Sequence, residues 1–281
     1  MSIYKANKEI TGIYVGTTQI SNAYIGSSQI YGGGSVSVDG VMFTAKQSNS
    51  TVGLDKLSTG QTLEYSTDGN SWNSMTTATT IALTNIGDSV YVRGVLSSNN
   101  TSSNYTNFKM TGNIKASGNI NYLWNYNNPD AALKTSCGRK LFYFCSALKD
   151  VTELELPATT LATHCYYQMF GFTQITTAPA LPATTLADVC YAWMFGYCSN
   201  LTTAPELPAT TLKSFCYDSM FSSCSNLNYI KCLATNISAT NCTNSWVSGV
   251  AASGTFVKNP NMTGWTTGNN GIPTNWTITD A

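Results

Sequence analysis

The chain has 281 residues, a formal net charge of zero, and charged side chains at only 10% of its positions. This length allows two or three domains with a buried core. Without an excess of Lys and Arg the chain lacks the basic surface that neutralises phosphates, so nucleic acid is not an expected partner. No run of about 18 apolar residues occurs, which predicts no membrane insertion.

The first residues, MSIYKANKEITGIYVG, lack a basic segment followed by an apolar one, so no secretory signal is expected. They begin three copies of a short repeat, IYKANKEITG, IYVGTTQISN and AYIGSSQIYG. Each copy reads as a strand, a turn of small residues and a second strand. The tyrosines and isoleucines that share a phase in these copies are Tyr4, Tyr14, Tyr24, Ile10, Ile20 and Ile30.

A repeat this short cannot bury a core, so the segment is expected to pack on copies of itself or on another protein. We predict that residues 1–34 form an arm for attachment and oligomerisation, with the six tyrosines and isoleucines as its contact residues. The alternative is an ordinary N-terminal β-meander docked on the next domain. The three glycines at 32–34 predict a flexible joint after the arm.

Residues 35–117 are predicted to form a small β-sandwich. Short apolar or alternating runs at residues 36–43, 63–65, 81–92 and 108–110 indicate strands. The Asp-Gly pairs at 39–40 and 68–69 are strong hairpin signals. Short strands at this spacing, separated by turn signals, are typical of sandwich domains.

Residues 118–257 carry a longer motif that recurs about every 26 residues, a period typical of stacked repeats. Its copies read LPATTLATHCYYQMF from Leu156, LPATTLADVCYAWMF from Leu181, LPATTLKSFCYDSMF from Leu207 and a degenerate LATNISATNCTNSW from Leu233. Each Leu-Pro is expected to end a short strand and each Thr-Thr-Leu to begin a second extended piece. The stretch from the cysteine to Met-Phe reads as a short helical turn. Residues 258–281 depart from the motif and are expected to cap the last core face.

The cysteines recur with the motif at two phases. Side chains of one phase in stacked repeats lie over one another, and free cysteine is among the most buried residue types. We therefore expect reduced, buried ladders, with the large apolar residue four positions later, such as Met194, also in the core. The spacing within a copy is too long for a usual zinc pair, so neither a metal nor a cofactor is expected. The two ladders are Cys137, Cys165, Cys190, Cys216 and Cys242, and Cys145, Cys198 and Cys224.

No catalytic residues are predicted. His164 is the only histidine, and the repeat places Val189 and Phe215 at its phase, which favours packing over catalysis. The carboxylates within residues 150–155 cluster ahead of the first full copy, where a solvated turn is the simpler interpretation. No Ser-His-Asp or Cys-His arrangement follows from these residues.

The positions at which the copies disagree carry the binding hypothesis. After Cys-Tyr the three copies read Tyr-Gln, Ala-Trp and Asp-Ser. Gln168 and Ser219 predict that their phase faces solvent, which makes Trp193 an exposed indole, and such rings suit sugars and protein hot spots. The alternative is that Trp193 folds back over Tyr191 or Tyr167 as a surface packing residue. The candidate ligand-binding residues are Tyr167, Gln168, Trp193 and Asp218.

The motif Leu-Pro-Ala-Thr-Thr-Leu, followed by Cys-Tyr-x-x-Met-Phe and a Cys-Ser-Asn-Leu-Thr-Thr-Ala-Pro link, resembles BspA-like leucine-rich repeats of bacterial surfaces and bacteriophage virions. The segments LEYSTDGNSWNSM and KMTGNI look like the β domain that often accompanies them. The resemblance covers about residues 35–281. It implies a mainly β fold with short helices, in which a small β-sandwich precedes a right-handed leucine-rich-repeat solenoid. The unit around Cys137 departs from the pattern because it lacks Leu-Pro-Ala-Thr-Thr.

The decapeptide Ile-Tyr-Val-Gly-Thr-Thr-Gln-Ile resembles the Tyr-x-Gly-Ser repeats of phage head and tail fibres. Together these patterns predict a non-enzymatic virion protein, a fibre or capsid decoration protein, that adheres to a host cell-surface protein or glycan. Its expected partners are other virion proteins, bound through the arm, and further copies of itself. The alternative is a bacterial cell-surface adhesin whose leader was removed. A glycan hydrolase would need paired carboxylates, and the repeats place none at matching phases.

Overall fold

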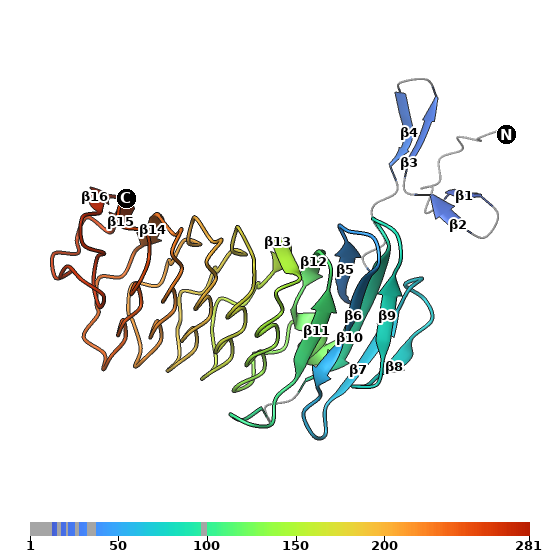
Figure 1. Cartoon of the computed structure of the whole chain (residues 1–281), viewed down its shortest axis with the longest axis horizontal. Helices are drawn as coiled ribbons and strands as arrows, with labels where there is room; N and C mark the ends of the chain where they lie inside the picture. The colour runs from blue at the N-terminus through green and yellow to red at the C-terminus, as the bar shows by residue number, and fades with distance from the viewer. Residues whose placement is uncertain (1–12, 16–17, 21, 26–27, 33–37, 97–99) are drawn as a thin grey trace. The chain divides into compact units, whose positions relative to one another are not determined.

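The computed structural model describes residues 13–15, 18–20, 22–25, 28–32, 38–96 and 100–281 (Figure 1). The chain divides into two compact units, Met1–Val38 and Asp39–Ala281. The fold is mainly β, as predicted. Within the described residues the one α-helix is α1 (Asn121–Asn125), which lies outside the full copies of the long motif.

The described part of the first unit consists of two antiparallel hairpins. β1 (Ile13–Val15) pairs with β2 (Thr18–Ile20), and β3 (Asn22–Ile25) pairs with β4 (Ser28–Gly32). These hairpins are the second and third decapeptide copies, so the two strands predicted for each copy are confirmed there. Tyr4 and Ile10 lie outside the described residues, as do the side chains of Tyr14, Tyr24, Ile20 and Ile30, and the arm's role stays a prediction.

Two sheets begin the second unit. The six-stranded sheet has the order β13-β12-β5-β10-β7-β8, and the three-stranded sheet has the order β11-β6-β9. Alternate residues of β5 are buried, which places Phe43 inward, 5.0 Å from the ring of Phe108 on the other sheet. The strands are β5 (Val41–Ala45), β6 (Ser50–Lys56), β7 (Thr62–Ser66), β8 (Asn73–Met75), β9 (Thr80–Leu83), β10 (Ser89–Val95), β11 (Asn107–Thr111), β12 (Ile114–Asn119) and β13 (Leu148–Glu155).

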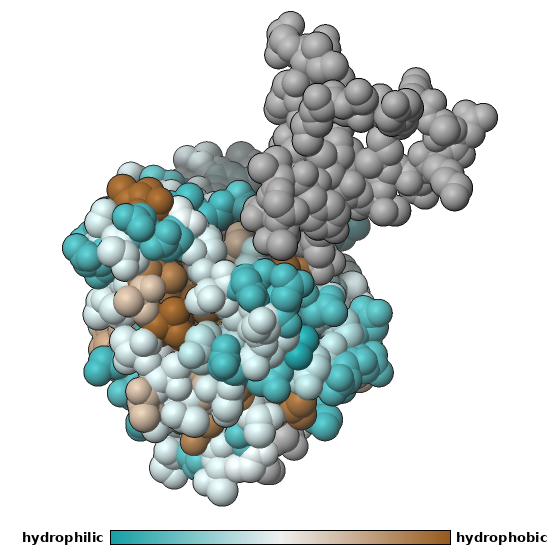
Figure 2. Space-filling model, turned by 90° about the vertical axis from the view of Figure 1, so that its right-hand side faces the viewer, coloured by the Kyte–Doolittle hydropathy of each residue, from teal (hydrophilic) through white to brown (hydrophobic). Residues whose placement is uncertain are grey.

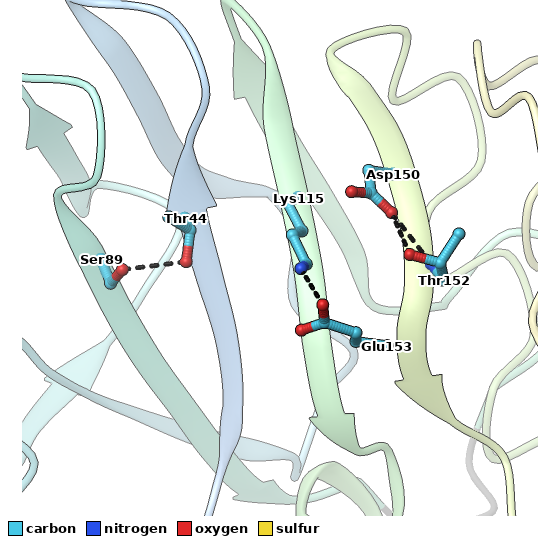
Figure 3. A network of polar contacts seen from close by, with 6 residues as sticks. All are labelled: Thr44, Ser89, Lys115, Asp150, Thr152 and Glu153. Atoms are coloured by element: carbon cyan, nitrogen blue, oxygen red, sulfur yellow. Dashed lines mark hydrogen bonds and ion pairs between the residues drawn. The ribbon is translucent and has the colours of Figure 1, made fainter. Parts of the chain in front are cut away.

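The six-stranded sheet continues into the repeats through β12. This strand pairs antiparallel with β5 and parallel with β13, so the boundary expected at residues 117–118 falls inside a shared strand. Figure 3 shows side-chain contacts along this sheet: Lys115 on β12 forms an ion pair with Glu153 on β13, and Thr152 donates a hydrogen bond to Asp150. The carboxylates at 150–155 therefore lie on a strand, and the interpretation as a turn was wrong.

Successive copies of the long motif hydrogen-bond to each other through their backbones. The N–H groups of Tyr166, Gln168 and Phe170 donate to carbonyls of the next copy at 2.9–3.0 Å. The residues between them donate instead to the carbonyl three positions back in their own copy. The same alternation recurs in the next two copies, so each lies beside the next, as the coils of Figure 1 show. A parallel sheet of β14 (Tyr229–Cys232), β15 (Thr255–Lys258) and β16 (Thr277–Asp280) continues the pattern.

The predicted helical turns between the cysteine and Met-Phe are wrong. In the first full copy this stretch is Cys165–Phe170, and Gln168 within it has φ of 54°, while His164 before it and Phe172 after it have φ of 57° and 61°. An α-helix needs negative φ throughout. The stretch is instead a run of turns that keeps alternate N–H groups directed at the next copy. Glycine is the usual sequence signal for this conformation, and none of these three positions carries it.

The register of the last copy also differs from the expectation. Leu207 bridges to Cys232, and Thr211 bridges to Asn236. The segment CLATNI from Cys232 therefore matches LPATTL, and the copy begins one residue before the expected Leu233. Aligning Leu233 with the opening leucine of the other copies placed the start of the last copy one residue too late, because Leu233 occupies the position of Pro208.

The tail covers the ring that ends the core. Trp246 is fully buried, its Nε1 donates to the carbonyl of Gly271 at 2.7 Å, and its indole stacks on Trp265 at 5.5 Å. Trp276 Nε1 donates to the carbonyl of Ala251 at 2.8 Å. Trp246 and Trp276 thus satisfy their N–H groups at the end of an apolar stack, as a terminal unit of a repeat array requires, whereas Trp265 Nε1 is buried without a hydrogen-bond partner.

Candidate binding surface

The cysteines form the interior of the repeats. All nine are free thiols and buried, so the predicted burial of both ladders is confirmed. Burial raises the pKa of Cys190 from its ordinary value of 9.0 to about 12, which keeps the thiol protonated and unreactive at neutral pH. The copy that begins at Leu156 has no cysteine at the phase of the second ladder. Thr173 occupies that position, with Oγ1 3.3 Å from Cys198 Sγ. In the described part of the chain, no cluster of three His, Cys, Asp or Glu residues is arranged to hold a metal.

His164 is half-buried at the edge of the repeats. Its ring lies 5.9 Å from that of Tyr167, and burial is the main cause that lowers its pKa, followed by the charge of Arg139. Val189 and Phe215 occupy the same phase and share its left-handed backbone. The imidazole is therefore neutral at physiological pH and occupies a position that other copies fill with apolar residues, which indicates a packing role.

Tyr167 and Asp218 belong to one column of side chains that runs across five consecutive copies. The Arg139 guanidinium lies 4.3 Å from the Tyr167 ring centroid, and Asn244 Nδ2 donates to Asp218 Oδ1 at 2.7 Å. Ala192 occupies the copy between Tyr167 and Asp218 and is buried. Burial raises the pKa of the Tyr167 phenol, with a smaller contribution from the carboxylate of Asp218.

Trp193 lies beside this column and is half-buried. Its indole is parallel to the ring of Tyr197, with an angle of 8° and centroids 6.3 Å apart. It also lies over Gly196, where an added Cβ would come within 2.8 Å of indole Cε3. The ring therefore packs on Tyr197, not on Tyr191 or Tyr167. The expectation that this phase faces solvent is wrong for Ser219, which is buried.

The structure brings the predicted site residues into neighbouring positions. The Trp193 N–H donates to the Asp218 carbonyl at 2.9 Å, and the Gln168 N–H donates to the Ala192 carbonyl at 3.0 Å. Tyr167 and Gln168 thus come from one copy, Trp193 from the next and Asp218 from the third. Side chains from neighbouring copies are thus close enough in the chain's arrangement to contact a single ligand.

The sequence reasoning missed a column of exposed aromatic rings, here named the aromatic ladder (Phe144, Phe172 and Tyr197). Phe144 is 60% exposed and Tyr197 is 44% exposed. Each ring lies 4.3 Å from the next, at angles of 18° and 8°. The signal was present in the sequence, because each of these residues follows its repeat cysteine by the same interval.

The hollow beside α1 offers no pair of acids. It measures about 330 Å³, and Asp130 is the one carboxylate among its lining residues, beside Asn121 and Leu133. Asn121 Oδ1 is buried there without a hydrogen-bond partner. Glycoside hydrolysis generally uses two carboxylates across the scissile bond, so this hollow lacks the groups for that reaction.

The end of the second unit that carries β7, β8 and β9 faces the viewer in Figure 2 and has a mainly polar surface. Residues that are hydrophilic (teal) or of intermediate hydropathy (near white) cover most of the coloured surface in that view, and hydrophobic residues lie in small patches. No described helix is long and apolar enough to cross a membrane.

Comparison with known protein families, curated proteins and solved structures gave no match. The functional inference therefore depends on the geometry of this chain.

Proposed function

We propose that the protein is a non-enzymatic structural component of a bacteriophage virion, a head or tail fibre or a decoration protein, that presents its repeats to a host cell-surface protein or glycan. In this proposal residues 39–281 comprise a small β-sandwich followed by a right-handed solenoid of BspA-like repeats. The observation that carries it is the outer surface on which three successive copies bring Tyr167, Trp193 and Asp218 together.

The distribution of reactive groups supports binding over catalysis. The thiols lie in the core, where burial raises their pKa. Among the described residues, no carboxylate accepts a hydrogen bond from the half-buried His164, so none orients its imidazole. General acid–base and nucleophilic catalysis both need a positioned pair of such groups. Outside the core, the repeats present rings, hydroxyls, amides and carboxylates such as Asp218, which are groups of a recognition surface.

The decapeptide hairpins support attachment to an assembly. Their described strands have three to five residues and pair only two by two. Isolated two-stranded hairpins are marginal in water, so they need further strands or a partner surface. Copies of the arm, or other proteins of the particle, would supply that surface.

Immunogold electron microscopy of particles purified from a producing culture tests the assignment. An antibody against residues 39–281 is expected to label heads or tails of phage particles. Label on bacterial envelopes in cultures free of particles would contradict the assignment and favour the alternative, a bacterial surface adhesin. An antibody pre-absorbed with the purified protein is the control.

A further inference from the structure

The aromatic ladder and Trp193 form a series of nearly parallel rings. The angle between neighbouring planes is 18° from Phe144 to Phe172, 8° from Phe172 to Tyr197 and 8° from Tyr197 to Trp193. The left-handed backbone at Phe144, Phe172 and Tyr197 holds the ladder positions in register. Rigid parallel rings need little ordering when a ligand binds, which favours affinity.

The series of rings stops at the copy that contains Trp193 and Tyr197. The next copy carries Ser219 at the phase of Trp193 and Ser223 at the phase of Tyr197. Backbone hydrogen bonds hold that copy in place, with the Tyr197 N–H donating to the Ser222 carbonyl at 2.8 Å. No ring of the next copy therefore covers these two aromatic side chains, and the ladder ends in a step bordered by Ser219, which is buried, and Ser223, which is half-buried.

The residue that precedes Ser219 in the chain carries a carboxylate. Asp218 is directly hydrogen-bonded through its carbonyl to the Trp193 N–H, and its side chain is half-buried. Asn244 Nδ2 holds one carboxylate oxygen at 2.7 Å, which fixes the side chain. A fixed carboxylate accepts hydrogen bonds from hydroxyl groups, and charge-assisted bonds of this kind are the stronger ones.

We infer that this step binds a neutral hexopyranose of a surface glycan, an inference that rests on the proposed function and names its ligand class. The C–H face of the sugar would stack on Trp193 and Tyr197, because ring faces carry partial negative charge and sugar C–H groups partial positive charge. Hydroxyls of the same sugar would donate to Asp218. A protein ligand fits less well, because a stable protein interface buries about 800 Å² per partner around an apolar centre, and here serines border the rings.

The repeat itself supplies matched substitutions for the test. Trp193→Gln installs the residue that stands at the same left-handed phase in the preceding copy, and Tyr197→Ser installs the residue of the following copy. Phe215→Asn is the control: Phe215 is an exposed ring outside the ladder, and Asn241 occupies its phase in the next copy. Each change is thus one that the repeat backbone already accommodates.

The probes are immobilised neutral polysaccharides (dextran, mannan, galactan and a β-glucan) in affinity electrophoresis of the full chain, with hyaluronan as the anionic comparison. At least one neutral polymer is expected to retard the protein. Trp193→Gln and Tyr197→Ser should each weaken that retardation by about tenfold, the size of a hot-spot loss. Phe215→Asn should change it less than about twofold. Trp193→Tyr, which keeps a flat ring, should retain most of the binding.

Retardation by none of the neutral polymers, by hyaluronan alone, or equally in the wild type and Trp193→Gln, would overturn the inference. A loss in Trp193→Gln that Trp193→Tyr does not restore would also overturn it, and so would an equal loss in Phe215→Asn. Parallel measurement of binding to whole bacteria separates this result from the proposed function. If cells still bind the protein while the polymers do not, the sugar site fails and surface binding stands.

Discussion

The repeat imposes a left-handed backbone conformation on Val189. Its φ is 60°, a conformation that is a genuine outlier for a β-branched side chain. Two features hold the backbone in this conformation. The Val189 N–H donates to the Ser214 carbonyl at 2.9 Å, and the next residue in the chain, Cys190, is buried in the core. Such conformations persist only where the surroundings enforce them.

Val189→Asn is expected to stabilise the protein by about 1 kcal/mol, because Asn tolerates the left-handed region. Asn241 already occupies this phase in a later copy. Urea unfolding monitored by circular dichroism measures the change. Val250→Asn is the control, since Val250 is half-buried without a positive φ and should gain nothing. A destabilised Val189→Asn variant would mean that the valine's packing outweighs its strain.

Alkaline pH should weaken the fold through the thiols. Burial raises the pKa of Cys137, Cys145, Cys190 and Cys232 from 9.0 to about 12. Below pH 9 these thiols are protonated in both the folded and the unfolded chain, so their contribution is fully present. Above pH 9 the unfolded chain releases protons that the folded chain keeps, and stability falls as pH rises towards 12.

The measurement is the free energy of unfolding by urea at pH 7, 9, 10 and 11. It should be nearly flat from pH 7 to about 8 and decline beyond, because the unfolded thiols begin to ionise as pH approaches 9.0. Buried tyrosines such as Tyr191, whose pKa burial also raises, add a loss of the same sign at higher pH. Cys190→Ala should reduce the slope between pH 9 and 10. A free energy that is constant to pH 11 would contradict the raised pKa values.

At the scale of elements, the sequence predicted the parts that depend on periodicity. The decapeptide hairpins and the cysteine ladders follow from residues recurring at fixed phases, because stacked copies place equal phases over one another. The turns within each copy did not follow. Their left-handed positions carry His, Val, Phe and Trp, so the usual glycine signal is missing. The aromatic ladder was also missed, although Phe144, Phe172 and Tyr197 share one phase of the repeat.

The equivalence of the copies predicts that one of them is removable. Deletion of residues 181–206 joins Ala180 to Leu207 and restores the same phases against the preceding copy. Each repeat contacts only its neighbours, so the shortened protein should fold with a lower unfolding midpoint. Deletion of residues 181–193, about half of that segment, puts every later phase out of register and should prevent folding of the repeats. Circular dichroism and a thermal melt separate the two outcomes, and equal behaviour would contradict the stacking.

At the scale of the whole molecule, the two compact units predict separable roles. Removing residues 1–38 should leave residues 39–281 folded, because the sheets and the repeats belong to the second unit. The truncated protein should lose oligomerisation, measured by light scattering after size-exclusion chromatography. A thermal melt of the truncated chain is the control for folding. If it assembles as the full chain does, the first unit has no attachment role.

The central claim is that the outer surface of the repeats binds a cell surface. Flow cytometry of the fluorescent full chain on a panel of bacterial strains tests it most directly. The comparison is a variant in which Gln168, Trp193 and Asp218 are replaced by Ser, Gln and Ala, residues that other copies carry at those phases. We expect saturable binding to at least one strain and a loss of about tenfold or more in the variant, at an unchanged melting midpoint. Binding to no strain, or equal binding by both proteins, would contradict it.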